Sequence, residues 1–275
     1  MQLPLVVGID GSESGFEALD WAADEAARHG RGLRAVFATS QERYDVVARE
    51  KTLGEPEPEE SARSALADAE RRVARRQPDV KVSLDVLPEE PVPALLQAGH
   101  EAFALVVGCR GRGPLKRMLL GSVSLAVAGR APCPTVVVRG DEQQRNGRFE
   151  RIVLGVDGTE QGAEAVRFAF REAESRGCEL RAVHAWQHAP DGRQAAERLL
   201  ADALAPAVAE HPKVRLRQEA VEAPERSLLL REAETADLLV VGSHRRTTPV
   251  GLHLGLVSHA LLHHAPCPVA VIPQT

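Results

Sequence analysis

The amino-acid sequence predicts an α/β protein of two tandem domains, each an open five-stranded parallel sheet with helices on both faces. Internal repetition is the first observation: residues 5–38 align with residues 152–185, and residues 105–138 align with residues 239–272. Short apolar runs alternate with longer amphipathic segments in each copy. The apolar runs are continuous, as is typical of parallel strands buried on both faces. Together these patterns predict a doubly wound sheet in each copy.

The duplication also sets the predicted domain boundaries. We assign residues 1–140 to the first domain and residues 150–275 to the second, with the polar run 139–150 as a linker. The first copy is longer than the second in its middle, between Thr39 and Lys81. The segment 48–60 in this interval is rich in Pro and Glu, so we expect an exposed loop there.

The first copy shows the expected order of elements. A helix is predicted over 14–30, because Phe16, Leu19, Ala23 and Ala27 recur at helical spacing and Gly30 ends the pattern. The other helices are predicted over 61–77, 91–102 and 122–131, and the strands over 3–10, 33–38, 80–87, 104–109 and 134–139.

Composition excludes several classes of protein. The chain has 275 residues and a formal net charge of -5, so it offers nucleic acid and anionic membranes no overall electrostatic attraction. No apolar run approaches the roughly 20 residues that span a bilayer, and the first residues lack the pattern of a signal peptide. We therefore expect a cytoplasmic protein that binds neither nucleic acid nor membrane.

The cysteines and histidines do not predict a metal site. The four cysteines lack CxxC spacing, so we expect buried free thiols in place of a disulfide framework or a thiolate site. His263 and Cys267 have a spacing found among metal ligands, but Pro266 between them disrupts that geometry.

A glycine-rich segment at the end of the fourth predicted strand is the strongest functional signal. Ligands of open α/β sheets bind beyond the carboxyl ends of the strands, and Gly108 and Gly111 would allow a sharp turn and a close approach to a ligand there. Gly121 and Ser122 open the next helix, whose free N–H groups favour phosphate. As alternatives, the glycines are simple turn residues, and Asp10 and Ser122 only cap helices.

These residues match the pattern of a known family. The spacing Gly108-x2-Gly111-x9-Gly121-Ser122, with "VGIDGS" near the start and "APCPTVVV" at the end of the first copy, resembles the ATP-binding universal stress proteins. The resemblance covers nearly the whole chain, in the tandem two-domain form. It implies a Rossmann-like fold of the adenine nucleotide alpha hydrolase type, with ATP or another adenine nucleotide bound together with Mg²⁺.

The resemblance also implies a set of binding residues in the first domain. Asp10 and the backbone of Ala38 would contact the adenosine portion, and the glycine-rich segment would surround the ribose and phosphates. The full implied set is Asp10, Gly11, Ala38, Gly108, Arg110, Gly111, Gly121, Ser122, Val123 and Ser124. Family members commonly pair through the last strand, here 134–138 and 268–272, which implies intramolecular domain pairing and a homodimer.

The second copy departs from this pattern. Arg245 replaces the second motif glycine, and Leu256 replaces the serine that follows Gly121 in the first copy. An arginine would obstruct a loop that needs close backbone approach, and the leucine removes a hydroxyl. The retained positions are Asp157, Ala185, Gly242, Gly255 and Ser258. We therefore expect weak or no nucleotide binding in the second domain.

Function follows from the binding site and from the motifs that the sequence lacks. We expect a stress-response regulator in which nucleotide occupancy modulates conformation and the binding of an unidentified protein partner. No GxxxxGK[ST] loop, GxSxG elbow or pair of catalytic carboxylates accompanies the glycine segment, so we predict that the protein is not an enzyme. Two alternatives stay open: a nucleotide-free dimerisation scaffold and a slow ATP hydrolase.

Overall fold

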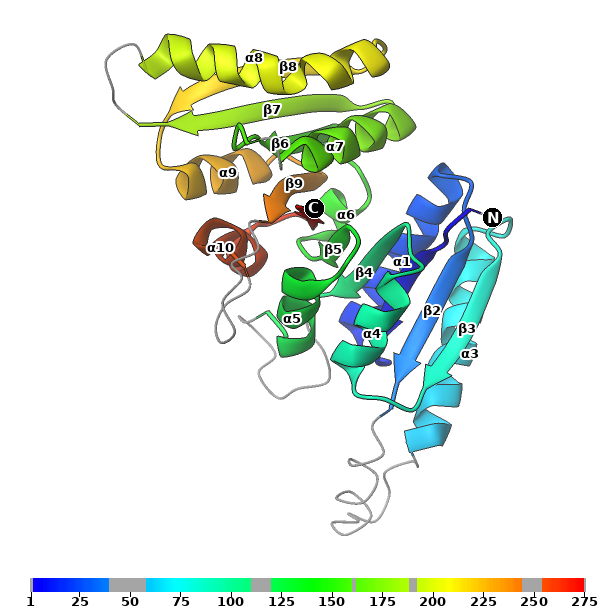
Figure 1. Ribbon diagram of the computed structural model, residues 1–275. Coiled ribbons are helices and arrows are strands. Elements are labelled where there is room, and N and C mark those ends of the chain that lie inside the picture. The colour runs from blue at the N-terminus through cyan, green and yellow to red at the C-terminus, as the bar shows by residue number, and fades with distance from the viewer. Residues whose placement is uncertain are drawn as a thin grey trace. The chain divides into compact units, whose positions relative to one another are not determined.

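The computed structural model describes residues 2–39, 58–109, 120–159, 162–187, 192–243 and 254–274. The chain divides into two compact units, Met1–Val138 and Arg139–Thr275. Each unit is a parallel sheet covered by helices, so the predicted duplicated α/β architecture is confirmed (Figure 1). Most of the predicted loop 48–60 lies outside the described residues.

The first unit is built on five parallel strands. They are β1 (Leu5–Ile9), β2 (Leu33–Ala38), β3 (Val82–Leu87), β4 (Ala104–Gly108) and β5 (Thr135–Val138), in the sheet order β3-β2-β1-β4-β5. The chain moves outward from β1 to β3 and then crosses back to β4, on the other side of β1. The order therefore reverses between β1 and β4, and open α/β sheets bind ligands beyond the carboxyl ends of the strands at such a point.

Helices cover both faces of this sheet. They are α1 (Glu13–Arg28), α3 (Pro58–Arg76), α4 (Pro91–Gly99) and α5 (Ser122–Arg130). Helices α1 and α3 pack side by side on one face, and α4 and α5 on the other (Figure 1). This is the arrangement that right-handed crossovers between parallel strands produce.

The buried face of α1 includes only part of the apolar period seen in the sequence. Leu19 and Ala23 are fully buried, whereas Ala27 is exposed and Phe16 is only half-buried. Ala22 and Ala26 are also fully buried. The predicted helix is confirmed, and the structure shows which of its apolar residues face the core.

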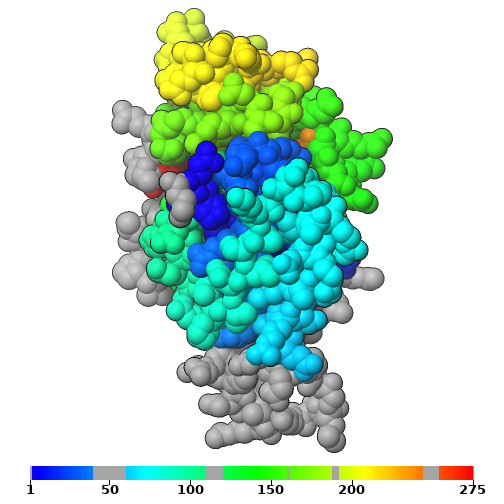
Figure 2. All heavy atoms as spheres, turned by 90° about the vertical axis from the view of Figure 1, so that its right-hand side faces the viewer, coloured from blue at the N-terminus to red at the C-terminus, as the bar shows by residue number. Residues whose placement is uncertain are grey.

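Arginine side chains join α3 to α1. The Arg72 guanidinium donates to both carboxylate oxygens of Asp20, at 2.6 and 2.7 Å, and Arg76 does the same with Asp24 at 2.9 and 2.8 Å. The hydrogen bond that Arg72 donates to Asp20 raises the pKa of Arg72. Figure 2 shows the α3 segment, in cyan, on the outer surface of this unit. Paired acceptors of this kind hold a surface helix with a defined orientation.

The second unit repeats the topology. Its strands are β6 (Arg151–Gly155), β7 (Glu179–Trp186), β8 (Arg215–Glu222), β9 (Leu238–Ser243) and β10 (Val269–Pro273), in the parallel order β10-β9-β6-β7-β8. Its helices are α6 (Glu142–Arg145), α7 (Ala163–Arg176), α8 (Gly192–Glu210), α9 (Glu225–Ala233) and α10 (Leu256–His264). The order reverses between β6 and β9, which correspond to β1 and β4.

The polar run between the copies has its own local structure. Asp141 caps α6, and Gln144, which is buried, completes the capping box by bonding the Asp141 backbone. Buried Asp237 accepts hydrogen bonds from the backbone N–H groups of Phe149 and Arg151. These contacts attach the segment to the second unit.

The cores consist mainly of aliphatic side chains on the strands. Cys133, Cys178 and Cys267 are buried free thiols, as expected, whereas Cys109 is partly exposed. Burial raises the pKa of the Cys133 thiol to about 11 and that of Cys267 to about 12. In the described part of the chain, no helix combines the length and the apolar character that a membrane crossing needs.

Candidate functional site

The strand ends at the switch point of the first unit bring the predicted residues to one edge. Strands β1 and β4 are paired in register, with Gly8 opposite Val107, and β1 and β2 are paired with Ile9 opposite Phe37. Asp10, Ala38 and Gly108 end or directly follow these three neighbouring strands. They therefore lie together at the carboxyl edge, as the sequence predicted.

The turn after β1 fixes the Asp10 carboxylate. Its Oδ1 atom accepts a hydrogen bond from the Ser12 backbone N–H at 3.0 Å, and Gly11 between them has a φ of 77°, which only glycine adopts readily. Ser12, not Asp10, caps α1: its Oγ atom accepts from the Gly15 N–H at 3.1 Å. A Cβ atom on Gly15 would lie 3.0 Å from Asp10 Oδ1. The carboxylate is thus held beside the start of α1, and the capping alternative for Asp10 is wrong.

Glycine at position 108 allows two segments of the chain to approach closely. It is the last residue of β4, and its φ is outside the left-handed region. A Cβ atom at this position would lie 2.5 Å from the Ser14 carbonyl oxygen and 2.7 Å from Ser14 Oγ. Glycine at 108 therefore allows β4 to pass against the first turn of α1, close to the Asp10 turn.

The start of α5 supplies backbone donors to the same edge. The Gly121 N–H donates to the Cys109 carbonyl at 2.9 Å, which brings the start of α5 to the end of β4. Gly121 is the N-cap and makes no side-chain capping bond. The first four N–H groups of a helix have no partner within it, so the amides of Ser122 and Val123 at the start of this nine-residue helix can bind an anion. Arg110 and Gly111 lie outside the described residues.

The two serines in the first turn of α5 have different environments. Ser122 is exposed and is available to a ligand. Ser124 is buried, and its hydroxyl donates to the Gly108 carbonyl oxygen at 2.6 Å. A hydroxyl has a single proton to donate, so Ser124 holds α5 against the end of β4 and has none left for a phosphate.

The second unit repeats the carboxylate turn. Asp157 Oδ1 accepts from the backbone N–H and the hydroxyl of Thr159, both at 2.9 Å, and Thr159 Oγ1 accepts from the Gly162 N–H at 3.2 Å. Gly158 has a φ of 73°, close to that of Gly11. Ala185 and Gly242 lie near the ends of β7 and β9, as Ala38 and Gly108 do on β2 and β4. The duplicated sequence therefore produces a duplicated turn.

The anion-binding half of the second site is altered. Leu256 begins α10 after the N-cap Gly255 and is 77% exposed, so an apolar side chain stands where the first unit has Ser122. Ser258 is buried, as is the equivalent Ser124. Arg245 lies outside the described residues.

Two residues that the sequence analysis did not identify contact the second site. The Gln274 amide nitrogen donates to Asp157 Oδ2 at 3.1 Å. The Leu199 side chain of α8 packs directly against Gly158. Neither residue belongs to a motif, and only the fold brings a residue after the last strand and a residue of α8 to the turn after β6.

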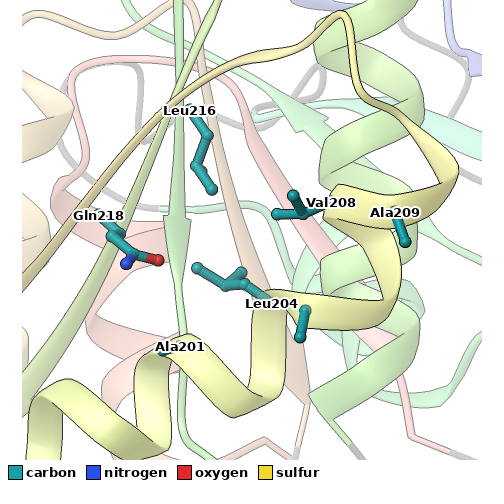
Figure 3. Close-up of a pocket in the computed structure, with 7 residues that line it drawn as sticks. Ala201, Leu204, Val208, Ala209, Leu216 and Gln218 are labelled. Atoms are coloured by element: carbon teal, nitrogen blue, oxygen red, sulfur yellow. The ribbon is translucent and has the colours of Figure 1, made fainter.

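A separate apolar hollow lies between α8 and β8 of the second unit. Its volume is about 500 Å³, and Leu204, Val208 and Leu216 point into it, with the Gln218 amide at one side (Figure 3). The remaining lining residues are Ala201, Ala205 and Ala209. Its lining contains no charged side chain that could hold a phosphate, so we assign the nucleotide site elsewhere.

Comparison with known proteins agrees with the fold and the duplication. The model of the universal stress protein family matches residues 1–139 and 148–273. Universal stress protein Rv2005c of Mycobacterium tuberculosis is 34% identical over 291 residues, covering 98% of this chain and 97% of that protein. A universal stress protein of Mycolicibacterium smegmatis is 34% identical over 283 residues, covering 98% and 96%.

Solved structures show the same fold. The crystal structure of a universal stress protein from Archaeoglobus fulgidus has a TM-score of 0.78 at 19% identity, covering 99% of this chain and 98% of that chain. The tandem family match, the full-length relatives and the shared fold lead to one assignment: this chain belongs to the universal stress protein family and contains two copies of its domain.

Proposed function

We propose that the first unit binds an adenine nucleotide, ATP with Mg²⁺, and that occupancy of this site regulates the binding of a protein partner. The observation that carries the proposal is the convergence of the fixed Asp10 carboxylate, the Gly108 strand end and the α5 amides at one edge of the sheet. The carboxylate accepts hydrogen bonds from the adenosine portion, and the amides of Ser122 and Val123 donate to phosphate oxygens. Ala38 offers its backbone beside Asp10.

The same residues favour binding over rapid catalysis. Asp10 is held by the turn that starts α1, and the other contributions from the described residues are backbone groups and the Ser122 hydroxyl. Backbone donors stabilise charge on a bound phosphate but cannot act as a general base for water. We therefore propose a regulatory nucleotide-binding protein, with homodimer formation as a further part of the proposal.

The test removes one backbone donor from α5 without breaking the helix. Proline is well tolerated at the first helical position, and Gly121 already has the extended ψ of 146° that a following proline requires. Ser122→Pro therefore removes one N–H and one hydroxyl, while Ser122→Ala removes the hydroxyl alone. Leu256→Pro is the matched control, because Leu256 has the same place on α10 and Gly255 has a ψ of 156°.

ATP and adenosine affinities are measured for each variant by isothermal titration calorimetry. We expect Ser122→Pro to weaken ATP binding at least about tenfold, since bonds to charged groups contribute about 1.5–3 kcal/mol, and to leave adenosine binding unchanged. Ser122→Ala should have a smaller effect, and Leu256→Pro none. A wild-type protein that binds no nucleotide would support the dimerisation scaffold, and release of phosphate from bound ATP would support the slow hydrolase.

A further inference from the structure

Three histidines gather in the last two turns of α10 in the second unit. His259 and His263 are four residues apart, so their side chains lie on the same face of the helix. Their ring centroids are 4.5 Å apart, and the ring of His264 is 6.1 Å from that of His263. Cys267, which has metal-ligand spacing to His263 in the sequence, is fully buried. The structure therefore pairs His263 with His259.

The separation of the two rings matches that of two imidazoles on one metal ion. Metal–nitrogen bonds are about 2.0–2.1 Å long, so each ring centroid lies about 3 Å from the ion. At a bond angle of about 90–110°, two such centroids are about 4.5–5 Å apart. Histidines at positions i and i+4 of a helix also supply two of the zinc ligands in the HExxH motif. The observed separation of 4.5 Å therefore fits a shared ion.

One nitrogen of this pair lacks a hydrogen-bond partner. His263 Nε2 is excluded from solvent and makes no hydrogen bond within the described part of the chain. Such buried polar atoms are uncommon in native proteins, and a bound ion is one of their physical explanations. Burial, together with the nearby His259, His264 and Arg139, lowers the pKa of His263. Its ring is therefore neutral at pH 7.5 and keeps the lone pair that a metal ligand needs.

The charge of Arg139 is directed at the backbone of the same helix end. Its guanidinium donates to the carbonyl oxygens of Leu261 and His263, at 3.4 and 3.0 Å, and to that of Leu262. These carbonyls lie at the C-terminal end of α10, which carries the partial negative charge of the helix dipole. They compensate part of the arginine charge, so its repulsion of a cation beside His263 is reduced.

The first copy of the sequence has none of these imidazoles. Leu125, Gly129 and Arg130 of α5 align with the three histidines of α10. The same helix of the second unit has Leu256 in place of the phosphate-binding Ser122. The pair is therefore a feature of the second unit alone, and it accompanies the loss of a phosphate-binding side chain.

We propose that His259 and His263 form a binding site for a divalent transition-metal ion such as Zn²⁺ or Cu²⁺. Each residue supplies one imidazole nitrogen, and because both side chains are only half-buried, water completes the coordination. Imidazole ligands select such ions over Mg²⁺, which prefers oxygen ligands. The site is therefore distinct from the proposed nucleotide site and does not depend on it.

The experiment measures Zn²⁺ binding to the full chain by titration calorimetry at pH 7.5. The proteins are the parent, His259→Gln, His263→Gln and His264→Gln. His264→Gln is the matched control, because it removes an exposed imidazole from the same turn without touching the pair. All four proteins carry Cys109→Ser, which removes the partly exposed thiol as a competing ligand. Histidine ring signals in nuclear magnetic resonance spectra, from protein labelled with ¹⁵N in histidine, locate the bound ion.

We expect the parent to bind Zn²⁺ at a site whose affinity falls at least about tenfold in both His259→Gln and His263→Gln. Loss of a group that only orients a ligand already costs about 10–100-fold, and these variants lose a ligand itself. His264→Gln should bind as the parent does, and the ring signals of His259 and His263 should shift together. Equal Zn²⁺ binding by all four proteins would mean that the two rings only pack against each other, and would overturn the proposal. No binding to the parent, or an equal loss in His264→Gln, would also overturn it.

Discussion

Substitution of Gly108 by alanine tests the packing that creates the first site. The added Cβ atom would lie 2.5 Å from the Ser14 carbonyl oxygen and 2.8 Å from the Ser14 carbonyl carbon. These are backbone atoms, so relief of the clash requires α1 or β4 to move. Gly242→Ala is the matched control, because its Cβ would meet only the flexible end of the Gln274 side chain, at 3.0 Å.

The expected change in the free energy of unfolding differs between the two substitutions. Overpacking of this kind costs about 1–3 kcal/mol, and replacement of a strand glycine by alanine recovers about 0.5–1 kcal/mol. We therefore expect Gly108→Ala to lower the free energy of unfolding by about 1–2 kcal/mol. Gly242→Ala should raise it by up to about 1 kcal/mol, because the Gln274 side chain can rotate away from the added Cβ and only the gain from replacing a strand glycine is left.

Each unit contains one tryptophan, which allows the two to be followed separately. Trp21 lies in α1 of the first unit and Trp186 ends β7 of the second. Urea unfolding is monitored by fluorescence in a Trp186→Phe background for Gly108→Ala, and in a Trp21→Phe background for Gly242→Ala. Gly108→Ala should also weaken ATP binding, because β4 carries the attachment of α5 through Ser124. Equal stability of the Gly108→Ala protein and its parent would refute the steric argument.

Three further predictions concern single side chains. Ser124→Ala should lower the free energy of unfolding by about 1 kcal/mol, because the buried bond to the Gly108 carbonyl is lost, whereas Ser122→Ala should leave urea unfolding unchanged. Cys109 should be the one thiol of four that reacts quickly with Ellman's reagent in the native state, because the other three are buried. Bound ATP should slow this reaction. Rapid reaction of the Cys109→Ser protein would contradict the assignment. Burial, together with the nearby His259, His264 and Arg139, lowers the pKa of His263 below its ordinary 6.5, so this contribution to stability should be complete above that value and be lost as the pH falls below it. His263→Gln should flatten this dependence in urea titrations at a series of pH values, and an unchanged slope would show that another group titrates.

Most of the fold could be predicted from the sequence. Continuous apolar runs such as "LVVG" predicted buried parallel strands, and the observed β2, residues 33–38, has the predicted bounds. Helix α1 was predicted within two residues at its C-terminal end, but its apolar period did not show which face is buried, because the period allows several rotations of an alanine-rich helix. Propensity and pattern decide that a segment is helical, and only the neighbouring sheet decides which alanines face it.

Part of the candidate site could be predicted from the sequence. The motif placed Asp10, Gly108 and Ser122 near one another because the carboxyl ends of parallel strands share an edge, and this follows from chain order alone. The tertiary structure decided what each residue does there: Ser124 bonds the Gly108 carbonyl, and Gln274 bonds Asp157. These contacts join residues far apart in the sequence, through side chains that belong to no local pattern. The sequence therefore determined the architecture and the edge at which we propose that a ligand binds. The hydrogen-bond partners required the packed fold, because they depend on distance in space and not on spacing along the chain.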